Sequence, residues 1–226
     1  MISVFLPCRL GSERIPNKNT KEFSGVKGGL LFIKLKQLLE LNNVEKIILS
    51  SNDNKVFEIA EDLSSERIIL DKRPDELASS STSTDDLIKY VPGIIKSDHI
   101  LWTHVTSPFI DSTIYTEAIN KYLIEIKKGI YDSLMSVNKV RTFIWNDKEP
   151  INYDRKKEKW PRTQTLPTLY EINSGFFISS RYNYVAYSDR IGKNPFLFEI
   201  NDRESFDIDW PEDFELAEVI YNKIKR

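Results

Sequence analysis

Several residue types on which large classes of proteins depend are scarce in this chain. Its 226 residues include one cysteine, Cys8, and two histidines. A lone cysteine excludes an internal disulfide framework and a thiolate metal cluster, and two histidines without a third imidazole or thiolate argue against a zinc site. We therefore interpret Cys8 as a small buried apolar residue at the end of a strand.

Long apolar runs are also missing. No segment approaches the roughly 18 apolar residues that a membrane-spanning helix needs. The first residues, 1–4, already have strand character and lack the basic and apolar regions of a signal peptide. These features predict a cytoplasmic protein with no membrane partner.

Neither sign of charge dominates the sequence. The 32 Lys and Arg residues nearly balance the 34 Asp and Glu residues, for a net charge of −2. This balance provides no electrostatic footprint for nucleic acid, so any basic site must be local. The hydrophobic share of 40% is ordinary for a globular protein. We expect residues 1–226 to form one domain.

Two common phosphate-binding motifs, the Walker loop and the dinucleotide glycine motif, are absent. Instead, a strand-like segment at residues 2–6 leads into a turn-rich loop that carries Arg9, Arg14 and Lys18. Such a loop presents backbone N–H groups and cations to a polyanion, which predicts a nucleoside triphosphate site. A strand followed by a basic loop also occurs in α/β proteins without a ligand there.

Strand-like and helix-like segments alternate along the chain, which predicts an α/β fold with a mostly parallel sheet and helices on its faces. Segment 139–172 departs from this alternation because it contains two tryptophans, three prolines and a Lys-rich stretch. We expect it to form a protruding hairpin or small lobe. The expected strands lie at residues 2–6, 46–50, 68–70, 100–102, 133–137, 173–178 and 196–200, and the expected helices at 31–39, 54–63, from 83 or 84, 112–126 and 211–225.

A second constellation lies near the other end of the chain. If residues 205–209 are extended, Asp207 and Asp209 project to one side while Ile208 enters the core. Two neighbouring carboxylates suit Mg²⁺, which takes one or two carboxylates together with substrate phosphates and waters. The alternative is a strand end whose acids are solvated or cap the following helix.

The loop pattern R-x-G-S-x-R-I-P-x-K-N at residues 9–19 and the ending D-I-D-W-P-E-D at 207–213 resemble the signatures of sugar-acid cytidylyltransferases, the CMP-sialic acid synthetase-like family. R-P-x-E-L-A-S at 73–79 resembles a third family motif. The resemblance implies a Rossmann-like three-layer α/β/α nucleotidyltransferase fold, Mg²⁺ as cofactor, and CTP and an acidic sugar as substrates. It also implies a homodimer in which 139–172 is the exchange or contact element.

The resemblance assigns roles to the residues at matching positions. Arg9, Arg14 and Lys18 would hold the triphosphate and stabilise the leaving pyrophosphate. Asp207 and Asp209 would bind the metal, and Asp209 is also an alternative to a metal-bound hydroxide as the base. The nucleotide-binding residues implied are Leu6, Arg9, Gly11, Ser12, Lys18, Asn19, Arg73 and Ser80.

The middle motifs imply a sugar pocket formed by His104, Thr106, Arg162, Gln164, Asn173 and Phe177. Arg162 is suited to the substrate carboxylate through bidentate pairing. This chain departs from the family pattern at Glu13, Ser80, His104, Val105, Ile110, Phe177 and Trp210. The histidine replaces a glutamine that touches the sugar, and the phenylalanine replaces a tyrosine, so we expect a sugar other than ordinary sialic acid.

The sequence therefore predicts a cytidylyltransferase that joins CTP to a nonulosonic or related 3-deoxy-keto acid sugar and releases pyrophosphate. Two alternatives remain open. A GT-A-like glycosyltransferase also uses D-x-D and Mg²⁺, although its motif usually lies mid-chain. A non-catalytic nucleotide-binding relative is suggested by the departures from the family pattern.

Overall fold

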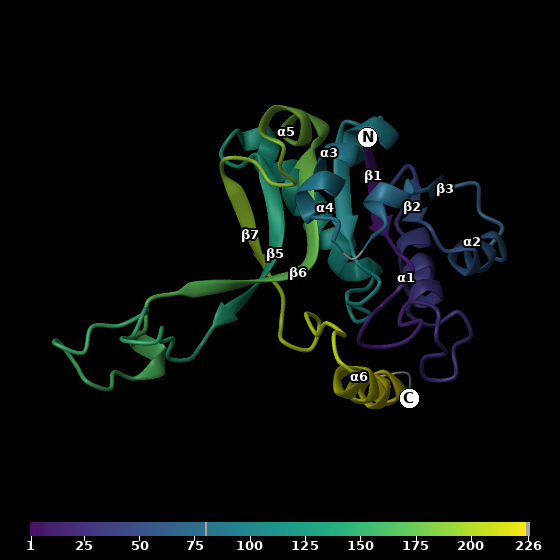
Figure 1. Ribbon diagram of the computed structural model, residues 1–226. Coiled ribbons are helices and arrows are strands. Elements are labelled where there is room, and N and C mark those ends of the chain that lie inside the picture. Colours follow the sequence, from purple (N-terminus) through teal and green to yellow (C-terminus); the bar gives the residue numbers. More distant parts are fainter. Residues whose placement is uncertain (80, 225–226) are drawn as a thin grey trace.

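The computed structural model describes residues 1–79 and 81–224. Within these residues, seven strands form one sheet in the order β3-β2-β1-β4-β6-β5-β7 (Figure 1). Strand β6 runs antiparallel to both of its neighbours, and the other pairings are parallel, which confirms the mostly parallel mixed sheet. The strands are β1 (Ile2–Pro7), β2 (Ile47–Ser51), β3 (Ile68–Lys72), β4 (His99–Thr103), β5 (Ser133–Val140), β6 (Leu169–Ser180) and β7 (Pro195–Glu199).

Helices cover both faces of the sheet and enclose two apolar cores. The larger core lies under α1, α2, α4 and α6, and the smaller lies under α3 and α5. Phe5 and Trp102 pack edge to face at 4.7 Å in the smaller core. The helices are α1 (Gly29–Leu39), α2 (Asn54–Glu61), α3 (Thr84–Ile94), α4 (Ser112–Lys128), α5 (Arg181–Tyr187) and α6 (Pro211–Ile224).

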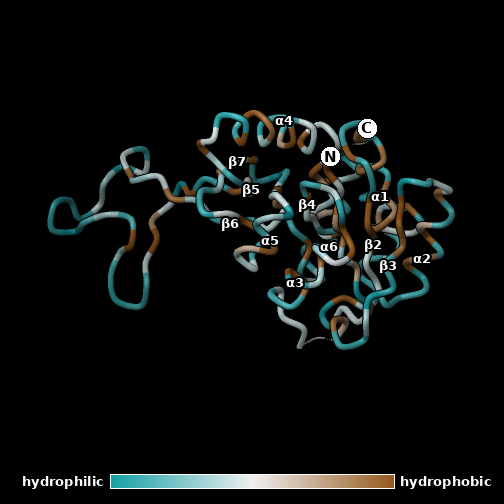
Figure 2. Tube along the Cα trace, turned by 90° about the horizontal axis from the view of Figure 1, so that it is seen from above, coloured by the Kyte–Doolittle hydropathy of each residue, from teal (hydrophilic) through white to brown (hydrophobic). Residues whose placement is uncertain are grey.

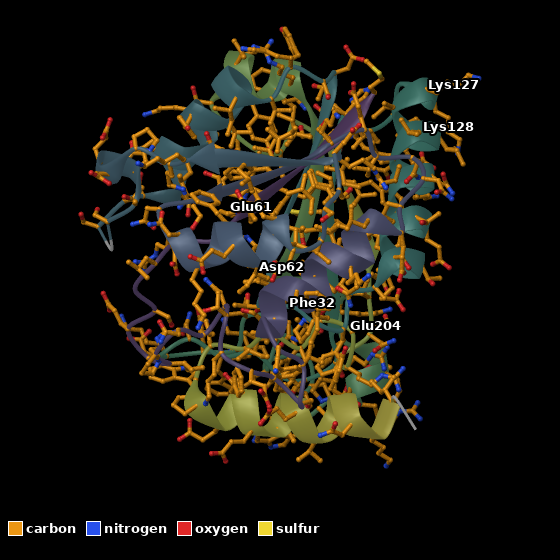
Figure 3. All side chains as sticks on the ribbon, turned by 90° about the vertical axis from the view of Figure 1, so that its right-hand side faces the viewer. Phe32, Glu61, Asp62, Lys127, Lys128 and Glu204 are labelled. Atoms are coloured by element: carbon orange, nitrogen blue, oxygen red, sulfur yellow. The ribbon has the colours of Figure 1, made fainter. Side chains whose placement is uncertain are left out.

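The face that carries α1 and α2 shows how the larger core is closed. Figure 3 shows the two helices side by side, with Phe32 of α1 near Glu61 and Asp62 at the end of α2. Helix α6 crosses below them, and Phe214 of α6 packs edge to face on Phe23 at 5.2 Å. None of the described helices is long and apolar enough to cross a bilayer.

The carboxyl ends of β1, β2 and β4 meet at one edge of the sheet. There, Cys8 N–H donates to the Ser50 carbonyl at 2.9 Å, and the Ser51 hydroxyl donates to the Cys8 carbonyl at 2.6 Å. The loop that follows β1 is therefore fixed at its root to the end of β2. Cys8 is buried and burial raises the pKa of its thiol to about 12, in agreement with a structural role.

Segment 141–168 forms an arm beyond the outer ends of β5 and β6, and it stands clear of the sheet in Figures 1 and 2. Its base is the paired stretch from Val137–Ile172 to Val140–Leu169. Phe143 packs on Tyr153 and Trp160 with ring centroids 5.1 and 5.7 Å apart, so the arm has a small aromatic cluster of its own. The protruding hairpin expected at 139–172 is thus present in the structure.

One expectation about local structure was wrong, and one helix was missed. Residues 205–209 are irregular and not a strand, because Ile208 N–H donates to the Thr106 carbonyl at 3.0 Å outside any ladder. Helix α5 was not expected: its seven residues are rich in tyrosine and show no leucine repeat, although the Ser180 hydroxyl caps it by accepting from Asn183 N–H at 3.2 Å.

Candidate active site

A cavity of about 380 Å³ opens at the carboxyl edge of the sheet, between the loop after β1, the start of α3, the end of β4 and the segment after α5. It has charged groups from both extremities of the chain. Its lining residues are Pro7, Arg9, Ser12, Glu13, Arg14, Lys18, Asn19, Arg73, Thr84, Leu87, Trp102, His104, Val105, Thr106, Arg190 and Asp209. Open, polar and cationic, this cavity suits a phosphorylated ligand.

The cations of the β1 loop meet the acids from the end of the chain. Arg14 Nη1 lies 3.2 Å from Asp209 Oδ2, and Lys18 Nζ lies 3.4 Å from Asp209 Oδ1. Lys18 Nζ also donates to the Ile208 carbonyl at 2.7 Å. These contacts join positions that are 190 residues apart in the sequence, as the sequence-based hypothesis required.

Backbone geometry shapes the loop. Gly11 and Asn17 have left-handed φ angles of 85° and 54°, values that glycine and asparagine tolerate best. Arg9 lies within the turn, where its Nη1 donates to the Gly11 carbonyl at 3.3 Å and its own carbonyl accepts from Asn19 Nδ2 at 3.3 Å. Ser12 lines the cavity beside them. The loop is thus held in shape while its cations face the cavity.

The two aspartates differ in environment. Asp207 is half-buried and accepts a hydrogen bond from the Ser107 hydroxyl at 3.2 Å, whereas the Asp209 side chain is 54% exposed. Burial raises the pKa of Asp207; a hydrogen bond from Thr106 opposes that shift, and the charge of Asp209 adds to it. Ile208 between them is fully buried, as expected.

The pair fits a divalent cation in its chemistry. Two carboxylates that repel each other, one half-buried and one open to the cavity, supply the hard oxygen ligands that Mg²⁺ prefers. Among the described residues, no group of three or more His, Cys, Asp or Glu side chains could hold a metal. The remaining ligands would therefore come from substrate phosphates and water.

Helix α6 begins directly after the aspartates with a substitute cap. Trp210 cannot cap the helix with its indole, but Asp213 Oδ2 accepts from the backbone N–H groups of Trp210 at 2.8 Å and Asp209 at 3.0 Å. Trp210 instead stacks on the guanidinium of Arg14 at 4.3 Å. Trp210, which departs from the family pattern, thus helps to position Arg14 at the cavity.

The remaining residues that were expected to bind the nucleotide take different positions. Arg73 is buried and lines the cavity, but its Nε and Nη2 donate to Ser50, so it also joins β3 to β2. Leu6 is fully buried in the larger core and does not line the cavity. Ser80 lies outside the described residues.

Two of the expected sugar-binding residues line the cavity. His104 is half-buried, and desolvation together with the charge of Arg190 lowers its imidazole pKa to about 3, so it is neutral at physiological pH. Thr106 follows it and accepts the Ile208 hydrogen bond through its carbonyl. Phe177 is buried below this region, on the strand next to Trp102.

The other expected sugar-binding residues lie elsewhere in the chain. Asn173 sits at the base of the arm, where it accepts from Ser136 Oγ and donates to Asn138 Oδ1, each at 2.6 Å. Arg162 and Gln164 are exposed on the arm, at the short 3₁₀ turn Thr163–Thr165. None of these three lines the cavity of its own chain.

The structure also adds residues that the sequence-based analysis missed. Arg190 lines the cavity from the segment after α5, and Thr84 and Leu87 line it from the first turn of α3. Lys34 is fully buried in α1 and donates to the carbonyls of Ser107 and Ile110 at 2.9 and 2.8 Å. Lys34 could not be singled out from the sequence because it lies on the face of the helix that carries the regularly spaced apolar residues. Arg190 lies in a stretch that matches no motif.

The chain is similar to known proteins along its whole length. A family model described as cytidylyltransferase matches residues 3–224. An N-acylneuraminate cytidylyltransferase of Escherichia coli is 28% identical over an aligned length of 229, which covers 100% of this chain and 53% of the relative. A pseudaminic acid cytidylyltransferase of Campylobacter jejuni is 24% identical, with 96% of this chain and 94% of the relative covered. The chain thus spans about half the length of the first relative.

Solved structures show the same fold. A CMP:2-keto-3-deoxy-manno-octonic acid synthetase complexed with CTP superposes with a TM-score of 0.68 and 14% identity, covering 98% of both chains. A 4-diphosphocytidyl-2C-methyl-D-erythritol synthase from Anaerococcus prevotii gives a TM-score of 0.71 and 15% identity, covering 98% of this chain and 96% of that one. The sheet order is therefore that of the nucleotidyltransferase α/β fold. Together with the family match over residues 3–224, this shows that the chain belongs to the cytidylyltransferase family.

Proposed function

We propose that this protein transfers CMP from CTP to a nonulosonic or related 3-deoxy-keto acid sugar and releases pyrophosphate. The observation that carries the proposal is the meeting of Arg14 and Lys18 with Asp209 at the edge of one cavity. Cations for a triphosphate and carboxylates for a metal are the two groups that nucleotidyl transfer needs. Relatives named for N-acylneuraminate and pseudaminic acid support an acidic sugar as the acceptor.

In this proposal the anomeric hydroxyl of the sugar attacks the α-phosphate in line. Arg9, Arg14 and Lys18, with the N–H groups of their loop, hold the triphosphate and stabilise negative charge on the leaving pyrophosphate. Asp207 and Asp209 would hold Mg²⁺, which supplies charge neutralisation and orients the phosphates when bound. Such a transfer depends mainly on the positions of the reactants and on electrostatics. A weak base such as Asp209 therefore suffices to accept the proton of the sugar hydroxyl.

His104 and Thr106 would contact the sugar from the end of β4. A neutral imidazole can donate one hydrogen bond and accept another, which matches a sugar hydroxyl. Arg162 and Gln164 stand on an arm that projects from the same molecule, so we propose a homodimer in which the arm of one chain reaches the cavity of the other.

The test is to incubate the protein with CTP, Mg²⁺ and each of three acids, N-acetylneuraminic acid, pseudaminic acid and 2-keto-3-deoxy-manno-octonic acid. We expect pyrophosphate release with at least one acid and the matching CMP-sugar by mass spectrometry. A parallel reaction with UTP in place of CTP tests whether the enzyme requires the cytosine ring. CTP binding without turnover would favour a non-catalytic relative; hydrolysis of a preformed nucleotide sugar would favour a glycosyltransferase, an alternative that the family match does not support.

A further inference from the structure

We infer that Arg190 is the residue that binds the carboxylate of the acceptor sugar, within its own chain. The inference rests on the proposed function and specifies how that function selects its substrate. Arg190 follows α5 and lines the cavity. Its guanidinium stacks on the Phe177 ring at 3.7 Å and lies 5.3 Å from the centre of the Trp102 ring.

The Arg190 guanidinium is positioned by aromatic rings. Within residues 1–79 and 81–224, no side chain or carbonyl pairs with it by a hydrogen bond or a salt bridge. Its acidic neighbour Asp189 instead accepts from the backbone N–H of Ile191 at 3.2 Å. A half-buried guanidinium that lies over aromatic rings, with none of its five N–H donors bonded to a described residue, is suited to a planar anion such as a carboxylate.

This cation is separate from the cations that the proposed function assigns to the triphosphate. Arg14 and Lys18 are already paired with Asp209, and Arg9 lies near Arg73 on the same side of the loop. Arg190 enters the cavity from a different element and packs on Phe177 and Trp102. His104 lies on the Trp102 side, with the two ring centroids 6.3 Å apart. The cations thus form two groups with different partners, and the cavity offers two anion subsites.

Two subsites match the chemistry of the reaction. In a 2-keto acid sugar the carboxylate is bonded directly to the anomeric carbon, whose hydroxyl is the nucleophile. An arginine that holds the carboxylate therefore fixes the adjacent anomeric carbon and the hydroxyl that it carries, which lowers the entropic cost of attack. Arg162, the arginine that the family resemblance assigned to this task, lies on the arm and outside the cavity of its own chain.

The experiment compares Arg190→Met, Arg162→Met and, as an unrelated exposed arginine, Arg203→Met. Each is assayed with the most active of the three acids named above and with the C1 amide of that sugar. For Arg190→Met we expect the KM of the acid to rise about 10- to 100-fold. The KM of the amide and of CTP should stay within about twofold, because neither contacts the guanidinium. Arg190→Lys should recover part of the preference for the acid, since the charge remains.

The inference is overturned if Arg190→Met keeps the preference for the acid over the amide, if the KM of CTP rises in parallel, or if Arg162→Met alone removes that preference. Loss of folding would appear as a lowered thermal transition in Arg190→Met, and Arg190→Lys then decides. If the wild-type protein forms no product, the proposed function fails independently. Calorimetric titration of the acids in the presence of CTP and Mg²⁺ then decides: binding that Arg190→Met abolishes supports the subsite, and absence of binding to the wild type refutes it.

Discussion

Asp209 and Asp213 stand four residues apart and illustrate two different uses of a carboxylate. Asp209 contacts the cavity cations Arg14 and Lys18 and is half exposed. Asp213 accepts two backbone N–H groups at the start of α6. Solvent-exposed ion pairs contribute little to stability, whereas a helix cap contributes measurably. Substitution of Asp209 should therefore lower mainly activity, and substitution of Asp213 should lower mainly stability.

For Asp209→Asn we expect pyrophosphate release to fall at least about 100-fold, because the proposed metal and phosphate site loses a charge. Its free energy of unfolding in urea should change by less than about 1 kcal/mol, since the lost ion pairs are exposed. Rate assays and urea titrations on the same preparations measure both quantities.

The matched variant Asp213→Ala should show the reverse. Loss of the cap should lower the free energy of unfolding by about 0.5–2 kcal/mol, while kcat stays within a few-fold of wild type. Equal losses of activity in the two variants would contradict the separate roles.

His104 should influence binding without setting the pH dependence. Its pKa is lowered to about 3, chiefly by burial, so the imidazole is neutral throughout the range from about pH 5 to pH 9. For His104→Gln we expect an unchanged pH profile of kcat/KM over this range and a sugar KM within about tenfold, because the amide also donates and accepts. His104→Leu should raise the sugar KM further; an acid-side inflection lost in both variants would contradict the interpretation.

The convergence of Arg9, Arg14 and Lys18 on one cavity could be predicted from sequence because these cations share one short loop. Arg190 could not be predicted, since what distinguishes it is the pair of aromatic rings below it, Phe177 and Trp102, which come from two other strands. Asn173 matched a family motif, yet its side chain is used within the base of the arm.

At the scale of elements, the start of α1 depends on Gly29. Its φ is +56°, and a Cβ built there would collide with the carbonyl oxygen of Lys21. Gly93 in α3 has no such neighbour within 4 Å. We expect Gly29→Ala to lower the free energy of unfolding by at least about 3 kcal/mol, from left-handed strain and overlap together. Gly93→Ala should be neutral or stabilising by up to about 1 kcal/mol, as thermal or urea unfolding would show.

Helix α1 also carries the buried Lys34, which donates to the loop at residues 107–110 and to the Tyr115 hydroxyl at 3.0 Å. Burial lowers its pKa from 10.5 to about 7. Between these values the unfolded chain binds more protons than the folded protein, so this residue makes stability rise with pH.

We therefore expect wild-type stability to gain up to about 1.4 kcal/mol per pH unit from Lys34 between about pH 7 and pH 10. Lys34→Met should lack this contribution, whatever its stability at pH 7. Urea titrations of both proteins at pH 7, 8 and 9 measure the two slopes, and parallel slopes would contradict the prediction.

Most strands and helices could be predicted because their apolar residues repeat at the period of the element that forms. The errors have physical reasons. The alternation around Ile208 imitates a strand, but its backbone pairs with a loop carbonyl. Helix α5 is short and tyrosine-rich, and it is stabilised by packing of Tyr184 in the smaller core more than by its own propensity.

At the scale of the whole molecule, the arm and the cavity can be tested together. In the proposed homodimer, Arg162 acts in the cavity of the other chain. Arg162→Met therefore removes the residue that the arm of one chain contributes to a site, and Asp209→Asn removes the residue that the cavity of the other chain contributes. When equal amounts of the two impaired variants are unfolded and refolded together, about a quarter of the sites should regain both residues. Recovery of about that share of wild-type activity, with a dimer in sedimentation, is the expected result; a monomer, or mixing without recovery, would refute the shared site.

The presence of the arm followed from composition, because a segment with prolines, tryptophans and a run of lysines does not fit a βα unit. Its direction did not follow, since that depends on the twist of β5 and β6 beyond the sheet. The fold as a whole was predictable from the order of its segments together with family motifs at both ends of the chain.

Strand β6 is continuous from Leu169 on the arm to Ser180 beneath α5. Its outer half pairs with β5 alone, and its inner half is clamped between β4 and β5, with a register shift opposite Met135 and Val137. Ser174, with a left-handed φ of 55°, lies between the two halves. Phe177, over which the Arg190 guanidinium lies, belongs to the inner half. In the proposed homodimer, the strand that leads to the partner-contacting arm would therefore also supply part of the proposed carboxylate subsite.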